Sequence, residues 1–313
     1  MKRSKSPVRR TCGTMSAHFR LLETVPEFRL RQAELERITA RSLTLLRAPR
    51  RELRTIPVVV HVVYRTDKEN ISTAQIKSQI AAMNKDFRAT NRDRKNVPSV
   101  WTGLVSDIQV EFALATRDPS GKPTTGIMPT KTMQSSFGPD DTVKSAKTGG
   151  ANPWPSTKYL NLWVCTLGDG LLGYAQFPGG PAATDGVVIL NSAFGTTGTA
   201  TAPFDLGRTT THEVGHWLNL RHIWGDTEDC SGTDFVADTP NAAGPNYGKP
   251  KFPHVTCNNG PNGDMFMNYM DYVDDDAMVM FTAQQAVRMH AALDGPRKGM
   301  GARKKATRVT LAP

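Results

Sequence analysis

The stretch THEVGHWLNLRHIWGD, residues 211–226, decides the fold of this chain. Its first two histidines, His212 and His216, are four positions apart, so a helix places them on one face. Two neutral imidazoles one turn apart can bind one zinc ion, and Glu213 follows the first of them, as the general base of such a motif does. The stretch therefore predicts a helix that binds zinc and carries a proton acceptor.

A third histidine, His222, comes six residues after His216. A continuous helix would carry His222 away from the metal, so the chain has to turn between the two. Asn219 lies in that gap, and asparagine adopts the left-handed backbone conformation more readily than most non-glycine residues. We expect the helix to stop at Asn219 and the turn to bring His222 to the metal. An acidic third ligand such as Glu228 is the alternative.

The string HEVGHWLNLRH resembles the long zinc signature of the metzincin metallopeptidases, with Asn219 where most members have glycine. Together with MNYMDY (267–272) it resembles the pappalysin family, and its ulilysin-like members most closely, over about residues 57–293. The resemblance implies an α/β (α+β) fold. It would be a metzincin-like zincin domain with a mixed twisted sheet, an active-site helix and an irregular C-terminal subdomain. The implied activity is that of a zinc endopeptidase acting on peptides or proteins.

The resemblance also assigns roles to two residues of MNYMDY. Met270 matches the methionine of the turn beneath the zinc, where its role is structural. Tyr272 matches the tyrosine that related enzymes swing towards the reacting carbonyl, where a phenol would stabilise the oxyanion. The alternative for Tyr272 is a tyrosine that packs in the pocket wall.

The remaining pattern predicts a sheet flanked by helices. Apolar and alternating runs predict the strands 56–64, 108–115, 159–165, 173–178 and 186–190. Capping signatures predict one helix after Ser72 and another from Thr282 to Leu293, and Asp205 is expected to cap the zinc-binding helix. Segment 170–180 resembles the upper edge strand of the metzincin cleft, which binds an extended peptide; an ordinary strand is an equal alternative.

The net charge of +10 resides in the two ends of the chain. Residues 1–56 hold 14 basic and 5 acidic residues and residues 294–313 hold 6 and 1, whereas residues 57–293 have a net charge of −4. Nucleic-acid binding needs a positive face on the folded part, so this distribution argues against it. No run of 18 apolar residues exists, so we expect no membrane span.

These observations predict three parts: an Arg-rich pro-segment (1–54), a catalytic domain (55–293) and a disordered basic tail (294–313). The pro-segment ends in RAPRRELR (47–54), which looks like an exposed, cleavable junction. Within it, Cys12 resembles the cysteine-switch leaders of related proenzymes, in which a thiolate fills the fourth zinc position and keeps the enzyme latent. The alternative is a stray thiol in a flexible arm.

Three further cysteines have structural interpretations. Cys230 and Cys257 flank a loop-rich segment where a disulfide would stabilise the fold, and the family resemblance implies that pairing. Cys165 ends an apolar strand and is expected to be a buried free thiol.

The segment 226–276 holds ten acidic residues and two lysines. Such density is typical of a solvated face. Ulilysin-like enzymes bind structural calcium near this segment, so the resemblance implies a calcium site here. We expect Asp234 and Asp238 to be among its ligands. Other candidates are Asp226, Asp229 and Asp264.

Aspartates in DYVDDD (271–276) are expected to border the pocket for the residue after the cut. One carboxylate facing that pocket would favour Arg or Lys, as ulilysin-like relatives do, and would make the junction a self-cleavage site at Arg50, Arg51 or Arg54. The alternative is that these residues solvate a loop or bind calcium.

We therefore expect a monomeric, secreted zinc endopeptidase made as a latent precursor, although the N-terminus shows no apolar export signal. Three histidines would hold zinc and leave one position for water, and Glu213 would move the protons. The rivals are a zinc-binding module without turnover and a nucleic-acid-binding protein that uses its basic ends.

Overall fold

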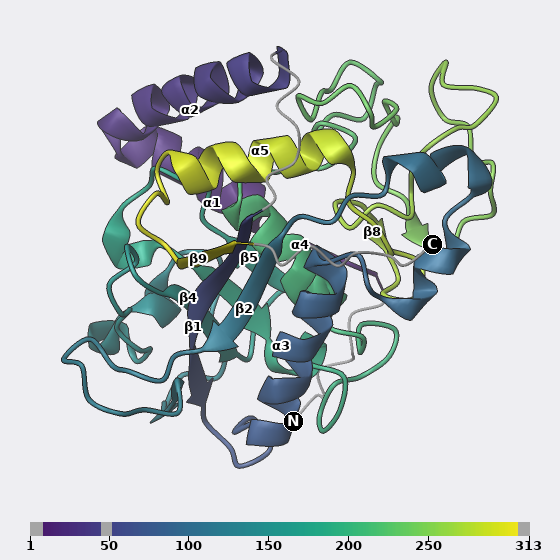
Figure 1. The fold of residues 1–313 in the computed structure, drawn as a ribbon. Coiled ribbons are helices and arrows are strands. Elements are labelled where there is room, and N and C mark those ends of the chain that lie inside the picture. The colour runs from purple at the N-terminus through teal and green to yellow at the C-terminus, as the bar shows by residue number, and fades with distance from the viewer. Residues whose placement is uncertain (1–8, 45–51, 306–313) are drawn as a thin grey trace.

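A seven-stranded mixed sheet forms the centre of the molecule (Figure 1). The computed structural model describes residues 9–44 and 52–305, with residues 302–305 described by their backbone. The strands follow the order β2-β1-β4-β6-β5, and β3 and β9 also pair with β1. Their bounds are β1 Glu52–Tyr64, β2 Val110–Leu114, β3 Ile127–Lys131, β4 Leu160–Cys165, β5 Gly173–Ala175, β6 Val187–Leu190 and β9 Ala302–Lys305.

β1 is the strand on which the sheet is built. It pairs in parallel with β2, β3 and β4, and it pairs antiparallel with β9. Val58 and Val60 join the main core on one face, while Val59 and Val63 join two smaller cores on the other. Burial on both faces explains why this strand is a continuous apolar run rather than an alternating one.

The helices α3 (Thr73–Phe87), α4 (Arg208–Trp217) and α5 (Ala283–Asp294) belong to the same core region. The capping predictions hold for two of them. Ser72 accepts a hydrogen bond from the Gln75 amide, and Thr282 with Gln285 forms a complete capping box. Six short 3-10 helices complete the described helices: Arg92–Asn96, Ser99–Leu104, Thr142–Lys144, Ala146–Thr148, Ala182–Thr184 and Asn191–Ala193.

The prediction for the start of α4 is wrong. The helix begins at Arg208 after Gly207, whose φ of 79° suits glycine, and not after Asp205. The Leu206 and Arg208 amides donate instead to Asp275 Oδ2, at 2.8 and 3.2 Å. A carboxylate 67 residues further along the chain therefore supplies the acceptor that a local cap would have supplied.

The described N-terminal residues 9–44, called the leader from here on, are folded and pack on the rest of the molecule. The leader forms α1 (Thr14–Thr24), which the sequence analysis missed, and α2 (Pro26–Thr44). In Figure 1, α2 (purple) lies along α5 (yellow). Phe28 and Leu35 of α2 are fully buried, so this helix is docked through an apolar face.

The prediction of a disordered tail from Asp294 is wrong for the part that the structure describes, and residues 306–313 lie outside it. Met300 is buried and β9 pairs with Glu52–Thr55 of β1. The predicted boundary between residues 54 and 55 thus lies inside a strand.

The predicted cut at Arg54 is also affected by this arrangement. The Arg54 side chain is buried and donates to Leu293 O at 2.6 Å, so Arg54 is not part of an exposed junction. Arg50 and Arg51 lie outside the described residues.

The C-terminal part is irregular, as predicted. Its strands are the two-residue β7 (Tyr247–Gly248) and β8 (Tyr272–Val273), which pair in parallel. The disulfide between Cys230 and Cys257 is confirmed, and Cys165 is a buried free thiol. Within the described ranges, every helix is too short or too polar to cross a membrane.

We predict that Arg297→Ala destabilises the protein by about 3–5 kcal/mol, because it leaves the buried Asp185 carboxylate without its cation. The Trp217 indole N–H, which donates to Asp185 Oδ1 at 3.2 Å, does not replace that charge. Arg297 forms two hydrogen bonds with Asp185, at 2.5 and 2.8 Å, donates to Trp217 O and lies 3.8 Å above the Trp217 ring. Chemical unfolding measures the change, and the exposed Lys298→Ala is the control. Equal unfolding midpoints for the two variants would contradict a folded tail.

Candidate active site

Helix α4 places His212 and His216 on one face, and both side chains are buried. The glycine of the motif, Gly215, has a packing reason: a Cβ there would lie 2.5 Å from Met270 Sδ. Met270 therefore packs directly against the helix that carries the two histidines.

The predicted turn at Asn219 is present. Helix α4 ends at Trp217, and Asn219 has a φ of 78°. The Leu220 amide then closes the turn by donating to Gly215 O at 2.9 Å. This reversal returns His222 to the face of the helix that holds the first two histidines.

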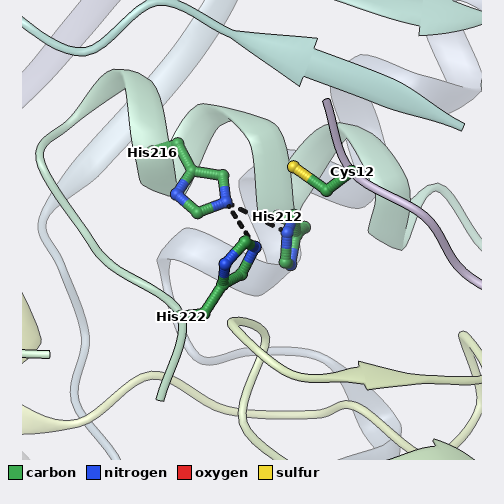
Figure 2. A group of neighbouring side chains, drawn as sticks. All are labelled: Cys12, His212, His216 and His222. Atoms are coloured by element: carbon green, nitrogen blue, oxygen red, sulfur yellow. Dashed lines mark hydrogen bonds between the residues drawn. The ribbon is translucent and has the colours of Figure 1, made fainter. Parts of the chain in front are cut away.

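The three imidazoles converge on one point (Figure 2). His216 Nε2 lies 3.1 Å from His212 Nε2 and 3.0 Å from His222 Nε2. All three side chains are at most 1% exposed. Glu228, the alternative third ligand, is exposed and is not among the residues of this cluster.

The hydrogen bonds of the rings determine their protonation. The Nδ1 atoms of His212 and His216 lie 2.7 and 2.8 Å from the carbonyl oxygens of Tyr269 and Leu220, so each must be the N–H donor. The Nδ1 atom of His222 lies 2.5 Å from Asp226 Oδ1.

Burial lowers the pKa of His212 and of His216 well below its usual range, which favours neutral rings. Their Nε2 atoms then have no proton to donate to one another, and their lone pairs face a shared point. A cation between the rings would explain why two nitrogen atoms without protons lie only 3.1 Å apart. Neutral, buried imidazoles of this kind suit zinc.

Cys12 of the leader completes the cluster. Its Sγ and one nitrogen of each histidine lie within 4.8 Å of one another, and Figure 2 shows the thiol beside the three rings. The structure therefore brings a possible fourth ligand from a segment 200 residues away along the chain to the predicted metal.

Glu213 lies beside this cluster and is 1% exposed. Burial raises the pKa of Glu213 to about 7. Its Oε2 accepts a hydrogen bond from Thr14 Oγ1 at 2.8 Å and lies 3.4 Å from Cys12 Sγ. The carboxyl that would handle protons is therefore covered by two leader residues.

Tyr272 lies over the same site. Its ring centre is 5.7 Å from that of His212 and 5.0 Å from that of His222. Burial raises the pKa of Tyr272 well above its usual range, so the phenol keeps its proton at neutral pH. This position suits an oxyanion donor and also the pocket-wall alternative.

The leader occupies the edge strand of the sheet. β5 pairs with β6 on one side only, and the leader pairs with its other side. The Gly13 amide donates to Gly173 O at 2.9 Å, and the Leu172 amide donates to Thr11 O at 3.1 Å. An extended chain therefore binds to this edge, which supports the cleft-rim interpretation of segment 170–180.

Arg10 is a functional candidate that the sequence analysis missed. Its guanidinium donates to Asp275 Oδ1 at 2.6 Å, and the side chains are 1% and 0% exposed. Asp275 is thus a residue of the DYVDDD segment that faces a buried cation, whereas Asp276 pairs with Lys249 at the surface. The signal that could have found Arg10 is the pair of arginines just before the TCG of the leader.

The predicted calcium ligands are dispersed. Among the described residues, the Cys12 cluster is the one group of three or more metal-ligating side chains. The five candidates have separate partners: Asp226 with His222, Asp229 with Ser231, Asp234 with Thr239, Asp238 with Thr282, and Asp264 with Thr256.

Comparisons with known proteins agree with this geometry. Residues 144–294 match the family model Peptidase M43, described as pregnancy-associated plasma protein-A. An extracellular metalloprotease of Pyricularia oryzae is 30% identical over 287 residues, which cover 89% of this chain and 86% of the relative.

Two solved structures from Tannerella forsythia are similar to this chain. Mature mirolysin in complex with a cleaved peptide has 52% identity and a TM-score of 0.78, over 80% of this chain and 96% of that one. A promirolysin mutant has 47% identity and a TM-score of 0.86, over 93% and 97%.

We predict that His222→Ala removes zinc from the purified protein, because two histidines alone bind it weakly, whereas Glu228→Ala retains it. Atomic absorption on the two variants, in a Cys12→Ala background that removes the thiol, measures the metal content. Zinc loss in the Glu228 variant alone would reverse the assignment.

Proposed function

The chain belongs to the M43 (pappalysin) family of metzincin peptidases, and from this premise we propose the residues that carry its activity. It is an extracellular-type zinc-dependent endopeptidase made as a latent precursor. His212, His216 and His222 hold the zinc, with Glu213 and Tyr272 as the catalytic side chains. The supporting observation is the convergence of the three Nε2 atoms beside a buried carboxyl.

Zinc in this site supplies Lewis-acid chemistry, which activates a water molecule and polarises the peptide carbonyl. Glu213 takes a proton from the attacking water and gives one to the leaving nitrogen. A carboxyl beside the metal site can serve in both steps. The Tyr272 hydroxyl, protonated at neutral pH, donates a hydrogen bond to the developing oxyanion.

The leader keeps the precursor latent through three contacts. Cys12 would fill the fourth zinc position, Thr14 covers Glu213, and residues 11–13 occupy the edge strand. Thr14 Oγ1 also accepts from the Ala175 amide at 2.8 Å, which ties it to the same rim. A peptide substrate needs all of these positions, so the leader and the substrate exclude one another.

Specificity for Arg or Lys after the cut follows from Asp275. In the precursor, its carboxylate binds the Arg10 guanidinium in a fully buried pair. Once Arg10 leaves, a buried carboxylate remains that needs a cation. A substrate arginine or lysine satisfies it.

Structural calcium is the second expected cofactor. The irregular part holds buried acidic groups: burial raises the pKa of Asp234 to about 7 and that of Asp271 to about 7. Asp264 and Asp271 are both 0% exposed and are bridged by the Asn246 side chain. Hard oxygen atoms of this kind suit calcium.

The alternatives differ in what they require. A zinc-binding module without turnover needs no general base, and a nucleic-acid-binding protein needs a positive folded face, which the net −4 of residues 57–293 does not offer.

We predict that Glu213→Ala lowers peptide cleavage by about a hundredfold or more while zinc stays bound, because Glu213 moves protons and does not ligate. Cleavage of a peptide library, with and without chelator, and the zinc content of both proteins measure this. Activity of the variant within about threefold of the wild type would refute the assignment of Glu213 as the base, and absence of cleavage by the wild type would favour a zinc-binding module without turnover.

We predict that Cys12→Ala raises the activity of the uncut precursor on a small peptide on the order of tenfold, which corresponds to about 1.4 kcal/mol of lost leader binding. The buried and remote Cys165→Ala is the matched control, since it also removes one thiol. Precursors that are equally silent or equally active would show that the thiol does not hold the leader.

We predict that calcium raises the melting temperature of zinc-loaded, calcium-depleted protein by about 5 °C at saturation, because binding to the folded state alone stabilises it. Asp234→Asn should reduce the shift, and Asp118→Asn, in an exposed turn outside the segment, should leave it unchanged. The same melting temperature with and without calcium would remove calcium from the cofactors.

A further inference from the structure

A second leader arginine, Arg9, lies next to Arg10 at the rim of the cleft. Its Cζ atom lies 4.9 Å from the centre of the Tyr247 ring, a distance at which a cation is attracted to an aromatic face. Arg9 is exposed, and Tyr247 is 37% exposed. The contact between Arg9 and Tyr247 is therefore exposed and lies outside the Asp275 pocket, three residues before Cys12.

Tyr247 is tied to the active site through the sheet. In the parallel pair of β7 and β8, Tyr247 is the register partner of Tyr272, and their ring centres are 6.0 Å apart. Because Tyr272 lies over the histidines, this pairing holds the Tyr247 ring at a constant place beside the cleft. The ring is part of the cleft wall rather than a free surface group.

The charges around this ring favour a cation. Burial raises the pKa of Tyr247, and the negative charges of Asp271 and Glu228 add to that effect, whereas Arg9 opposes it. The aromatic face and the Glu228 carboxylate thus act in the same direction on a positive side chain. Glu228 lies outside the histidine cluster, and its negative charge acts on the Tyr247 ring instead.

We propose that Tyr247, with Glu228 near it, forms a second cation subsite that binds an arginine or lysine two residues after the cut bond. The inference rests on the proposed peptidase function and deepens it. Asp275 takes the first basic residue after the cut, and Tyr247 takes the second. The substrate class is then peptides with two adjacent basic residues on the far side of the cut.

The leader shows how two neighbouring side chains reach the two places. Arg10 enters the Asp275 pocket, and Arg9, one residue further from the metal cluster, lies on the Tyr247 ring. Adjacent residues of an extended chain point to opposite sides, which suits one buried and one rim position. The leader runs parallel to β5, and Arg9 precedes Arg10. The proposal therefore requires a substrate that binds antiparallel to β5, so that the residue after the one in the Asp275 pocket reaches the same rim.

The sequence contains a second arginine pair in RAPRRELR, at Arg50 and Arg51. A cut before Arg50 would present the first arginine to Asp275 and the second to Tyr247. The chain's own predicted junction thus belongs to the proposed substrate class.

The test uses full-chain protein whose leader has been removed, by self-processing or by limited trypsin digestion, and three peptides. They differ only after the cut: Arg-Arg, Arg-citrulline and citrulline-Arg. Citrulline keeps the size of arginine without its charge. For the wild type we expect the Arg-citrulline peptide to have a kcat/KM about three- to fivefold lower than Arg-Arg, the range that an exposed cation–π contact gives.

Three variants assign that difference. Tyr247→Phe keeps the ring and should keep the preference for Arg-Arg over Arg-citrulline, whereas Tyr247→Leu should make the two kcat/KM values equal. Phe252→Leu, an exposed aromatic residue of the same irregular part that packs on Trp101, is the control and should keep the preference.

The outcomes separate this inference from the proposed function. Equal rates on Arg-Arg and Arg-citrulline in the wild type, or a preference that survives in Tyr247→Leu, would overturn the second subsite. Loss of discrimination between Arg-citrulline and citrulline-Arg in Asp275→Asn concerns the first pocket only. Failure to cleave any of the peptides would refute the peptidase function itself.

Discussion

Three buried imidazole rings converge on one point, and the rest of the structure depends on that constraint. Each ring is held by its other nitrogen: His212 by Tyr269 O, His216 by Leu220 O, and His222 by Asp226. These acceptors come from the methionine turn, from the turn after α4 and from the loop beyond it. The irregular part of the chain is therefore a support that orients the metal ligands.

The leader occupies the same groups that a substrate would use. It binds the edge strand as an added chain, places a thiol at the histidines and fills an acidic pocket with a guanidinium. Farther away, Glu36 of α2 forms two hydrogen bonds with Arg288, whose guanidinium also donates to Asn219 O, in the turn that delivers His222. The leader thus contacts the turn at Asn219 through Arg288, in addition to the contacts that it makes within the cleft.

The sequence predicted the features that depend on local spacing or on a matched motif. The zinc helix, the turn at Asn219 and the capping box at Thr282 each involve residues within about one turn of one another. The misses are long-range. Asp275 replaces a local cap for α4, and β9 and Arg297 fold a basic tail that composition alone marks as disordered. Arg10 is one of many leader arginines until the fold sets it beside Asp275.

The leader and the cleft belong to one chain, and this connection has a consequence for the persistence of latency. A tethered segment meets its binding site at an effective concentration in the millimolar range, whatever the concentration of the protein. Dilution on release from a cell therefore does not open the cleft. A single cut after residue 44 turns the same contacts into an encounter between two molecules, and dilution then favours their separation. One bond in the backbone decides whether an unchanged set of contacts behaves as permanent or as transient.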